Sequence, residues 1–462
     1  MSAAMHDAAI IGAGPAGLAA ATRLAGHGAD TVLLDEQAAP GGQIYRGIET
    51  CSPALRQSLG PDYAHGAGLA AAFRASTAAY RPETAIWQVT PEGEIWTKHQ
   101  GRAGLVRARH IIIATGALER PVPVPGWTLP GVMTAGAVQI LLKSAALLPE
   151  GLVLAGSGPL LYLLAAQCIA TGAPPAALVD TTSRAHERAA LRHLPALIHA
   201  PARQMLRKGM GLKAAIRRAG VPVYRHAAAL RIEGETEARA ISFTSGGQRH
   251  RLETRLIALH EGVIPHQQMT RAIGCTHEWN AAQHCFQPVL DEWGQSSVDG
   301  ILVAGDASGI GGATVAETSG QIAALAVLHH LGRLSATERD KLAAPYLAAR
   351  RKQLAFRPFL DALYAPRPEI TTPPDEVMVC RCEEITAGMV RDAARQGAQG
   401  PNQVKSFLRA GMGPCQGRVC GPVVASLLSD ALGQDPQTTG YYRIRPPLKP
   451  ITIGELADLD QG

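Results

Sequence analysis

Aromatic residues make up only 4% of the 462-residue chain, and no run rich in lysine or arginine stands out. Lysine and arginine exceed aspartate and glutamate by only 44 − 38 = 6. A nucleic-acid surface needs clustered positive charge, and single-stranded ligands also need aromatic platforms. The sequence therefore argues against nucleic acid as a partner.

Cysteine is scarce too, because the whole chain holds eight. So few cysteines in a long chain do not form a disulfide scaffold. No C-x-x-C motif lies near the glycine-rich motifs of the chain, which argues against a disulfide reductase. Cys168 lies in an apolar helical stretch and is expected in the core, and Cys275 and Cys285 are expected to be structural. Four others cluster late, which indicates a metal site and a reducing compartment.

Long apolar runs are almost absent. The one stretch that resembles a transmembrane segment is Gly151 to Ala170, but it contains Gly156-Ser157-Gly158-Pro159, which predicts a strand, a tight turn and a helix. No basic region and cleavage site precede the first apolar run, so no signal peptide is predicted. We therefore expect a soluble, cytoplasmic protein.

The composition that remains is that of a globular protein with a large core. Apolar residues make up 46% of the chain and charged residues 18%, which excludes wholesale disorder. At roughly 150 residues per domain, the length suggests about three domains. The 49 glycines and 32 prolines form no repeat, so we expect them in turns and nucleotide loops.

The first motif is a dinucleotide fingerprint at the N-terminus. The apolar run 8–11 leads into Gly12-Ala13-Gly14-Pro15-Ala16-Gly17 and then into the helical pattern Leu18 to Leu24. The next apolar run, Thr31 to Leu34, ends in Asp35-Glu36. This order predicts a βαβ unit whose helix N-terminus binds a pyrophosphate.

Each fingerprint residue has an expected role. Gly12 permits the tight turn, Gly14 lets the pyrophosphate approach the backbone, and Gly17 lets the helix pack on the strand. Asp35 can accept hydrogen bonds from ribose hydroxyls.

Three later segments narrow the nucleotide to FAD. Pro40-Gly41-Gly42-Gln43 is a glycine-rich loop shortly after the acid, and Ile111 to Ala114 is a strand that enters Thr115-Gly116. A third strand, Gly300 to Ala304, ends in Gly305-Asp306, and an amphipathic helix is expected over Gly309 to Leu328. Asp306 could bind the ribityl hydroxyls of a flavin. In this order, the pieces resemble the two-dinucleotide-domain flavoproteins of the glutathione-reductase superfamily, over residues 8 to about 330.

The resemblance implies a second Rossmann unit, which here carries Gly156-Ser157-Gly158-Pro159-Leu160-Leu161 and a later strand ending in Val179-Asp180. Leu161 replaces the third glycine, so the helix must sit further from the strand or tilt. No arginine pair follows Asp180 as a 2′-phosphate site would need. We expect a degenerate NAD(P)-binding-like domain, either vestigial or holding an adenine nucleotide such as ATP structurally.

A basic helical region, Arg184 to Arg218, is expected to be either a solvated face or a docking surface for an acidic partner. Further on, Ala365 to Pro368 and Thr371 to Pro374 are proline-rich and predict a linker.

The late cysteines form a C-x-C pair and a C-x4-C pair separated by 32 residues. Glycines around the second pair leave backbone N–H groups free to point at sulfur, as iron–sulfur clusters require. Four thiolates fit either zinc or [2Fe–2S], and the C-x-C spacing favours the cluster. Two short helices are expected between the pairs, over Thr386 to Arg395 and Pro401 to Arg409. The expected metal ligands are Cys380, Cys382, Cys415 and Cys420.

The whole chain, including its segment Gly411-Met412-Gly413-Pro414-Cys415-Gln416-Gly417-Arg418-Val419-Cys420, resembles one group: the FAD-binding A (alpha) subunits of heteromeric amino-acid dehydrogenases. Opine oxidases, D-hydroxyproline dehydrogenase and hydrogen cyanide synthase (its B subunit) belong to this group. The cluster domain resembles bacterioferritin-associated ferredoxin, except that its second cysteine pair has a longer spacing. The resemblance implies the fold class: α/β, with two Rossmann-like domains of the glutathione-reductase type and a small C-terminal helical [2Fe–2S] domain.

The domains expected on this basis have the following bounds: residues 1–120 and 250–340 bind FAD, 121–249 form the degenerate second domain, 341–374 a helix and proline-rich linker, 375–435 the [2Fe–2S] domain, and 436–462 a tail. The expected FAD-binding residues are Gly12, Gly14, Pro15, Ala16, Gly17, Asp35, Glu36, Gly42, Gln43, Ala114, Thr115, Gly116, Gly305 and Asp306.

The implied function is electron transfer. A second flavoprotein (beta) subunit would oxidise the C–N bond of an amino acid or opine, and this chain would pass electrons through FAD and cluster to an acceptor other than NAD. A small ferredoxin-like subunit is a further candidate partner, and a quinone acceptor would bring the complex to the inner face of the membrane. Arg381, Lys405, Arg409 and Arg418 flank the cluster and are expected to meet an acidic partner. The alternatives are an NAD(P)H-dependent ferredoxin-type reductase, a hydrogen cyanide synthase subunit, a reductase that serves an iron store, and a zinc module.

Overall fold

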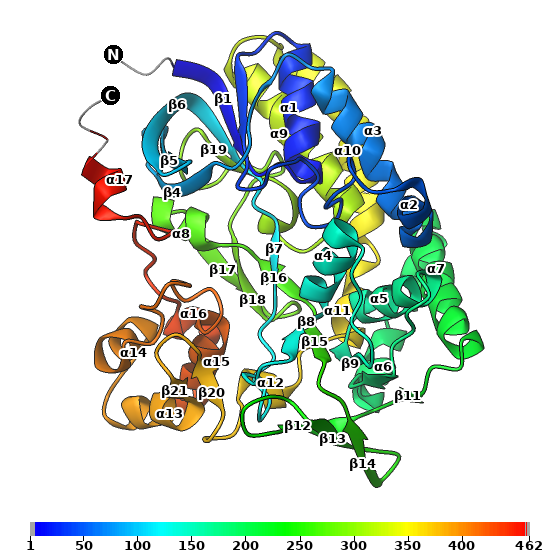
Figure 1. Ribbon diagram of the computed structural model, residues 1–462. Helices are drawn as coiled ribbons and strands as arrows, with labels where there is room; N and C mark the ends of the chain where they lie inside the picture. Colours follow the sequence, from blue (N-terminus) through cyan, green and yellow to red (C-terminus); the bar gives the residue numbers. More distant parts are fainter. Residues whose placement is uncertain (1–4, 458, 460–462) are drawn as a thin grey trace.

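A computed structural model of the chain describes residues 5–457 and 459. Figure 1 shows two α/β units and a smaller, mainly helical C-terminal unit. The predicted fold class is therefore confirmed. Within the described residues, no helix combines the length and the apolar character needed to cross a membrane.

The first sheet has seven strands in the order β3-β2-β1-β6-β5-β4, with β19 beside β6. The long strand β6 pairs with β1 along one edge, and its other edge is shared between β5 and β19. Strands β1, β2, β3, β6 and β19 run parallel, so their carboxyl ends meet at one edge of the sheet. The strands are β1 (Met5–Ile11), β2 (Thr31–Leu34), β3 (Ala79–Arg81), β4 (Ala85–Val89), β5 (Glu94–His99), β6 (Arg102–Ile113) and β19 (Ile301–Val303).

Helices α1 (Pro15–Gly26) and α9 (Ala313–His330) pack against each other beside this sheet (Figure 1). Gly320 marks their close approach, because a Cβ there would lie 2.1 Å from the carbonyl oxygen of Ala16. The sequence placed the start of the second helix at Gly309, whereas Gly309 to Gly312 precede it as a loop. The other helices of this unit are α2 (Pro53–Leu59), α3 (Pro61–Arg74) and α10 (Ala336–Leu354).

The second sheet has five parallel strands in the order β11-β10-β9-β15-β8. The stretch Gly151 to Ala170 forms a strand, a tight turn and a helix, as its glycines predicted. The strands are β8 (Val132–Thr134), β9 (Val153–Ser157), β10 (Ala177–Asp180), β11 (Val223–Tyr224) and β15 (Ile257–Glu261), and the helices are α4 (Ala135–Ala145), α5 (Pro159–Ala170), α6 (Arg184–Leu191), the 3₁₀ helix η1 (Leu194–Ile198) and α7 (Ala200–Arg218).

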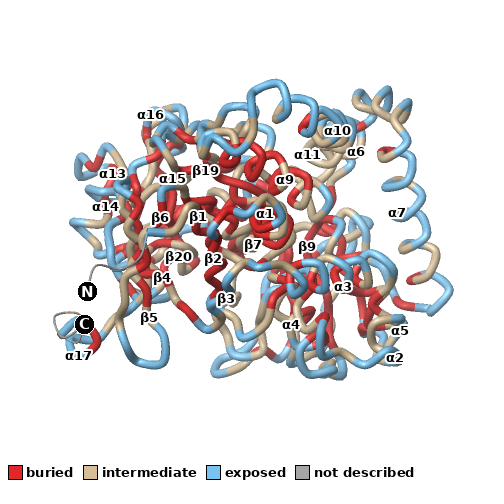
Figure 2. Tube along the Cα trace, turned by 90° about the horizontal axis from the view of Figure 1, so that it is seen from above, coloured by how far each residue is buried: buried red, intermediate tan, exposed pale blue. Residues whose placement is uncertain are grey.

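The second unit extends beyond the boundary expected at residue 249. Strand β15 pairs with β9 and β8 inside the second sheet, so the chain returns to the first unit only after Glu261. The residues of β15 are all buried, His260 and Glu261 included, and its apolar start at Ile257 to Leu259 fits either sheet equally well in the sequence. Most of α7 is exposed (Figure 2), so much of the basic region Arg184 to Arg218 is solvated.

Antiparallel pairs complete the two α/β units. Strands β7 (Ala117–Glu119) and β16 (Val263–Pro265) pair where the chain leaves and re-enters the first unit. Two short helices, α8 (Gln268–Ile273) and η2 (Gly305–Ala307), follow in the part of the chain after this return. The remaining strands are β12 (Ala228–Glu233), β13 (Ala240–Ser245), β14 (Gln248–Glu253), β17 (His277–Asn280) and β18 (Cys285–Pro288).

The C-terminal unit packs on the first one. One continuous core contains Ile111 of the first sheet, Met269 of α8, Val424 of α15 and Tyr442. The two predicted helices between the cysteine pairs are present as α13 and α14, and the proline-rich linker holds one short helix, α12. The elements are α11 (Arg357–Leu363), α12 (Pro368–Thr371), β20 (Met378–Cys380), β21 (Ile385–Thr386), α13 (Ala387–Arg395), α14 (Pro401–Leu408), α15 (Gly421–Leu432), α16 (Pro436–Thr439) and α17 (Ile453–Ala457).

Candidate functional site

The N-terminal glycine turn is built so closely that side chains are excluded. A Cβ on Gly17 would lie 1.8 Å from the carbonyl oxygen of Gly12, and a Cβ on Gly12, whose φ is +106°, would lie 2.5 Å from that of Ala114. Pro15 opens α1 at a position where no helical N–H is needed. The free N–H groups of this helix end are therefore open to a phosphate.

The loop after the acid closes over this turn. A Cβ on Gly42 would lie 2.8 Å from the Cα of Gly14, so the two backbones touch. From α4, the ammonium group of Lys143 donates hydrogen bonds to the carbonyl oxygens of Gln43, at 3.2 Å, and Ile44, at 2.8 Å. Burial lowers the pKa of Lys143 to about 7. The sequence did not point to Lys143 as a residue of this site, because its helix contains no motif and the loop that it binds lies far away in the chain.

The two acidic residues that follow β2, Asp35 and Glu36, have different hydrogen-bond partners. The Asp35 carboxylate accepts hydrogen bonds from the backbone N–H groups of Ala13, at 2.5 Å, and Gln37, at 2.7 Å. Burial raises the pKa of Asp35, and these two bonds oppose that rise. Glu36 instead accepts from Lys449 at 2.8 Å. Asp35 is therefore the acid that faces the glycine turn.

The three strands that lead into the expected flavin-binding residues end next to one another. Backbone N–H groups of Ala114 and Ala304 donate to Ile11 and Ile113, so β1, β6 and β19 end side by side. A Cβ on Gly305 would lie 3.0 Å from the Cβ of Ala16, so this segment rests on the start of α1. Ligands of open α/β sheets bind at such carboxyl ends.

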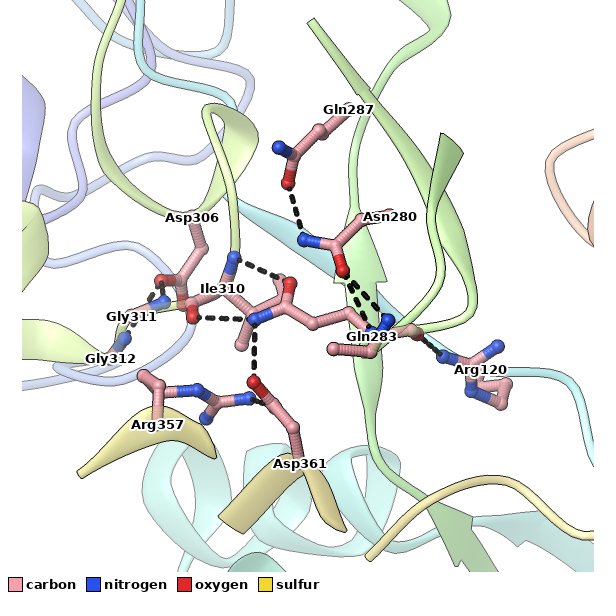
Figure 3. A network of polar contacts seen from close by, with 11 residues as sticks. Arg120, Asn280, Gln283, Gln287, Asp306, Ile310, Gly311, Gly312, Arg357 and Asp361 are labelled. Carbon is pink, nitrogen blue, oxygen red and sulfur yellow. Dashed lines mark hydrogen bonds and ion pairs between the residues drawn. The ribbon is translucent and has the colours of Figure 1, made fainter. Parts of the chain in front are cut away.

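Asp306 holds the loop that enters α9. Its Oδ1 accepts hydrogen bonds from the backbone N–H groups of Gly311 and Gly312, both at 2.9 Å (Figure 3). The side-chain amide of Gln283 binds the same loop, because it accepts from the N–H of Ile310 at 3.3 Å and donates to its carbonyl at 3.2 Å.

The hairpin turn that carries Gln283 is itself anchored. Arg120 donates to the carbonyl oxygen of Gln283 at 2.6 Å (Figure 3). It also donates to that of His284 at 2.9 Å. Gln283 also approaches Asp361 of α11, which is paired with Arg357. These supporting residues come from segments with no motif, so no sequence pattern pointed to them.

The four late cysteines come together as two neighbouring pairs. The neighbouring Cys420 thiol lowers the pKa of Cys380 to about 6. The backbone N–H groups of Gly411, Glu383 and Cys382 lower this pKa further, and one of these three residues is a glycine of the second pair's loop. Burial raises the pKa of Cys382, which interacts with Cys415.

The cysteine arrangement fits a two-iron cluster. Among the described residues, no group of three or more histidine, cysteine or acidic side chains is placed to hold a single metal ion. Each iron of a [2Fe–2S] cluster needs only two cysteines, because sulfide completes its coordination. The glycines of the loop make room: a Cβ on Gly413 would lie 2.2 Å from the Cβ of Cys382, and one on Gly411 or Gly417 would lie 2.8 Å from the ring of Tyr442.

The basic flank of the cluster is only partly free, contrary to expectation. Arg418 donates to the carbonyl oxygens of Cys415, at 3.0 Å, and Leu448, at 2.7 Å, so it is a structural residue. Arg409 is exposed but paired with Glu383 at 3.1 Å. Leu448 follows Arg418 by 30 residues in the sequence, so no local pattern could reveal the contact between them.

In the second dinucleotide fold, side chains of the chain itself bind the residues at the strand ends. Leu161 is fully buried in its core, and the next residue, Tyr162, donates to the Asp180 carboxylate at 2.5 Å. At the ends of the neighbouring strands, Ser157 and Thr181 both donate to Glu261 at 2.9 Å.

An arginine from the linker adds to these contacts. The guanidinium group of Arg367 lies 2.8 Å from the Glu261 carboxylate, and the two side chains are 6% and 0% exposed. The sequence identified Leu161 as the departure of this fold and Asp180 as the acid at its strand end, but it missed Arg367 and Glu261, which lie outside the glycine motif.

Comparison with known proteins agrees with this geometry. Residues 6–320 match the pyridine nucleotide-disulphide oxidoreductase family, and residues 378–430 match the BFD-like [2Fe-2S] binding domain. The opine oxidase A subunit of Rhizobium meliloti is 48% identical over 98% of this chain and 99% of that protein. Hydrogen cyanide synthase subunit HcnB of Pseudomonas aeruginosa is 31% identical over 97% of this chain and 98% of that protein.

A solved structure extends the likeness to the whole fold. The crystal structure of L-proline dehydrogenase from P. horikoshii covers 98% of this chain and 79% of its own, with a TM-score of 0.72 at 19% identity. The resemblance stated from the motifs is confirmed, as are the two cofactors, FAD and [2Fe–2S]. The chain, which combines a flavin domain with a [2Fe–2S] domain, belongs to the pyridine nucleotide-disulphide oxidoreductase family and to the family of opine oxidase A subunits.

Proposed function

We propose that this chain is the electron-transfer subunit of a heteromeric opine or amino-acid dehydrogenase. The observation that carries the proposal is the presence of a flavin domain and a [2Fe–2S] domain in one chain, over nearly the full length of the opine oxidase A subunit. A second flavoprotein subunit oxidises the C–N bond, and this chain passes the electrons on. The higher identity to the opine oxidase protein, 48% against 31%, favours it over hydrogen cyanide synthase.

The carboxylates of the flavin domain support this division of labour. Asp35 and Asp306 are bound to backbone N–H groups and hold loops in place. A group that removes a proton from a substrate needs a free lone pair near its operating position. These acids are arranged for binding and positioning, so we place substrate oxidation in the partner.

The flavin site is proposed to use the residues that gather at the edge of the first sheet. Gly12, Gly14 and Gly17, with Pro15 and Ala16, present the helix end to the pyrophosphate, and Asp35 orients the ribose. The loop of Gly42 and Gln43, the strand end Ala114-Thr115-Gly116, and Gly305-Asp306 shape the remainder, whereas Glu36 is turned toward Lys449. When bound, FAD exchanges one or two electrons and the cluster exchanges one.

The cluster ligands are proposed to be Cys380, Cys382, Cys415 and Cys420. Anaerobically purified protein should hold about two irons per chain and show the broad red absorption of a [2Fe–2S] centre. Cys415→Ser should remove this absorption and leave the flavin bands. Cys275→Ser, which changes a buried cysteine outside the cluster, should keep both. Stoichiometric zinc without iron would overturn the ligand assignment.

The closed edge of the second dinucleotide fold supports an acceptor other than NAD. Tyr162 is hydrogen-bonded to the Asp180 carboxylate, and Arg367 is paired with a second carboxylate, that of Glu261. Both carboxylates lie at the strand ends where a dinucleotide would bind. This arrangement disfavours the NAD(P)H-dependent ferredoxin-type reductase and leaves a ferredoxin-like subunit or a quinone as candidate acceptors. Arg381 and Arg409 are exposed beside the cluster and offer positive charge to an acidic partner.

Co-expression with a second flavoprotein subunit tests the proposal. The two chains should form a stable heteromer that oxidises an opine or amino acid with an artificial electron acceptor. The isolated chain should keep both cofactors and show no such turnover. If the isolated chain oxidises the substrate as fast as the heteromer, substrate oxidation does not belong to the partner.

A further inference from the structure

The segment that joins β16 to α8 is bound to the flavin side of the molecule. The backbone N–H of His266 donates to the carbonyl oxygen of Gly116 at 3.0 Å. The Thr115 hydroxyl donates to the carbonyl oxygen of His266 at 3.4 Å. His266 is therefore fixed to the end of β6, where the proposed flavin residues Thr115 and Gly116 lie.

The same segment is bound to the cysteine loop on its other side. The Nε of Arg418 donates to the Nε2 of His266 at 3.4 Å, and another nitrogen of Arg418 donates to the carbonyl oxygen of Cys415 at 3.0 Å. Gln268 adds a parallel link, because its amide donates to the carbonyl oxygen of Gln416 at 2.9 Å. A continuous chain of hydrogen bonds thus runs from Gly116 through His266 and Arg418 to Cys415.

The bond from Arg418 fixes the tautomer of His266. A guanidinium group only donates hydrogen bonds, so the Nε2 that accepts from it carries no hydrogen. The proton of the neutral imidazole therefore lies on Nδ1. Burial, and then the positive charge of Arg418, lower the pKa of His266 to about 3, which keeps the ring neutral.

Two polar atoms of this bridge lack partners among the described residues. The Nδ1 of His266 and the Oε1 of Gln268 are both buried and unpaired. An unpaired buried polar group destabilises the folded chain, so such atoms indicate a partner supplied from outside the chain. The fixed tautomer makes Nδ1 a donor, so the partner it lacks is an acceptor.

We propose that His266 is a positioning residue that couples the flavin to the cluster: its Nδ1–H donates to an acceptor on FAD, and its Nε2 holds Arg418 and thereby the cysteine loop. The step is the transfer of one electron from the reduced centre to the oxidised one, between flavin and cluster. No covalent bond forms or breaks in it, so it needs no co-reactant. The inference rests on the proposed flavin and cysteine sites and assigns the link between them.

His277 provides a matched control on the same side of the molecule. It is also largely buried, and burial lowers its pKa to about 3 as well. Its two ring nitrogens, however, have partners within the chain: the carbonyl oxygen of Cys275 at 2.8 Å and the Thr270 hydroxyl at 2.9 Å. It therefore shares the burial of His266 without an unpaired atom.

The test uses the full chain with both cofactors bound. His266→Phe keeps a ring of similar shape and removes both nitrogens, and His277→Phe is its control. Flavin and iron content, the flavin absorption bands, and the electron paramagnetic resonance of the reduced cluster are measured first. The rate of electron exchange between the centres is then followed after rapid photoreduction of the flavin.

We expect His266→Phe to retain both cofactors, shift the flavin bands and slow electron exchange roughly tenfold, the effect of about 1.4 kcal/mol on the barrier. The control should change neither the bands nor the rate, and His266→Gln, which restores a donor, should recover part of the band position. Arg418→Met covers the case in which His266→Phe does not fold, and it should slow the exchange without shifting the bands.

Two results would overturn the inference alone. One is wild-type electron exchange in cofactor-replete His266→Phe or Arg418→Met. The other is an unchanged flavin spectrum in His266→Phe, because Nδ1 would then face water rather than FAD. A wild-type chain that carries no iron would instead overturn the cysteine assignment, and this inference with it.

Discussion

The chain contains two versions of the same strand–turn–helix unit, and the residues at their strand ends have different partners. In both units a glycine turn follows the first strand, and an acid ends the next one: Asp35 in the first unit and Asp180 in the second. Asp35 is bound by backbone N–H groups, including that of Ala13 in the glycine turn itself. Asp180 accepts from the backbone N–H of Thr182, as Asp35 does from that of Gln37, but its other oxygen accepts from the side chain of Tyr162 instead of from the glycine turn.

The difference lies mainly outside the motif. One changed glycine, at position 161, alters the turn of the second unit, but the strand ends are closed by Glu261 and by Arg367 from the linker. The ion pair at these strand ends stabilises the second unit, because the buried Glu261 carboxylate and Arg367 guanidinium group neutralise each other. A fingerprint therefore predicts the fold of a unit, whereas the residues at the neighbouring strand ends decide whether it is accessible.

Removal of Arg367 should have the largest effect. Arg367→Ala leaves Glu261 buried without its cation, and the loss of one partner of a buried pair costs about 3–5 kcal/mol. We expect this loss in the free energy of unfolding, measured by urea denaturation and by the thermal midpoint. Arg239→Ala breaks an exposed pair with Glu237 and should cost about 0–1 kcal/mol. Equal losses in the two variants would show that the second unit does not depend on the pair of Arg367 and Glu261.

In the first unit, a substitution in the glycine turn should reduce the binding of FAD. Gly17→Ala places a Cβ 1.8 Å from the backbone oxygen of Gly12, so α1 must move away from the strand. Overpacking of this kind costs about 1–3 kcal/mol, and we expect FAD occupancy to fall by roughly tenfold or more. Flavin absorbance per chain measures this effect.

Gly26→Ala is the control for that substitution. Gly26 ends the same helix and has no heavy atom within 4 Å of its added Cβ. The variant should retain its full flavin content. Full flavin content in Gly17→Ala as well would show that the helix can shift without loss of the phosphate site.

Sequence patterns predicted the elements of both units well, because each glycine turn is local. Gly12, Gly14 and Gly17 lie within six consecutive positions, and the strands beside them are short apolar runs. The spacing of the late cysteines likewise indicated a cluster without any structure. In each of these motifs, the residues that act together lie close together in the sequence, so the pattern can be recognised without a structure.

The rest depends on contacts between distant segments. Arg367 lies 106 residues from Glu261, and His266 lies 152 residues from Arg418. Strand β15 falls within the bounds expected for the first unit, because the apolar start of so short a strand does not show which of two parallel sheets it joins. Arg418 was expected at a docking surface because its charge is visible in the sequence and its backbone partners are not.

The smallest effects should come from Tyr162. Tyr162→Phe removes one hydrogen bond to a carboxylate that still accepts from the backbone N–H of Thr182, so about 1–2 kcal/mol of stability should be lost. The wild-type protein should keep its flavin oxidised when mixed with NADH or NADPH, because Arg367 and Glu261 still close the strand ends. Tyr162→Phe should behave in the same way in a stopped-flow measurement. Rapid bleaching in the wild type would restore the NAD(P)H reductase as the function, whereas bleaching in Tyr162→Phe alone would mean that this one hydroxyl, and not the buried ion pair, excludes the nucleotide.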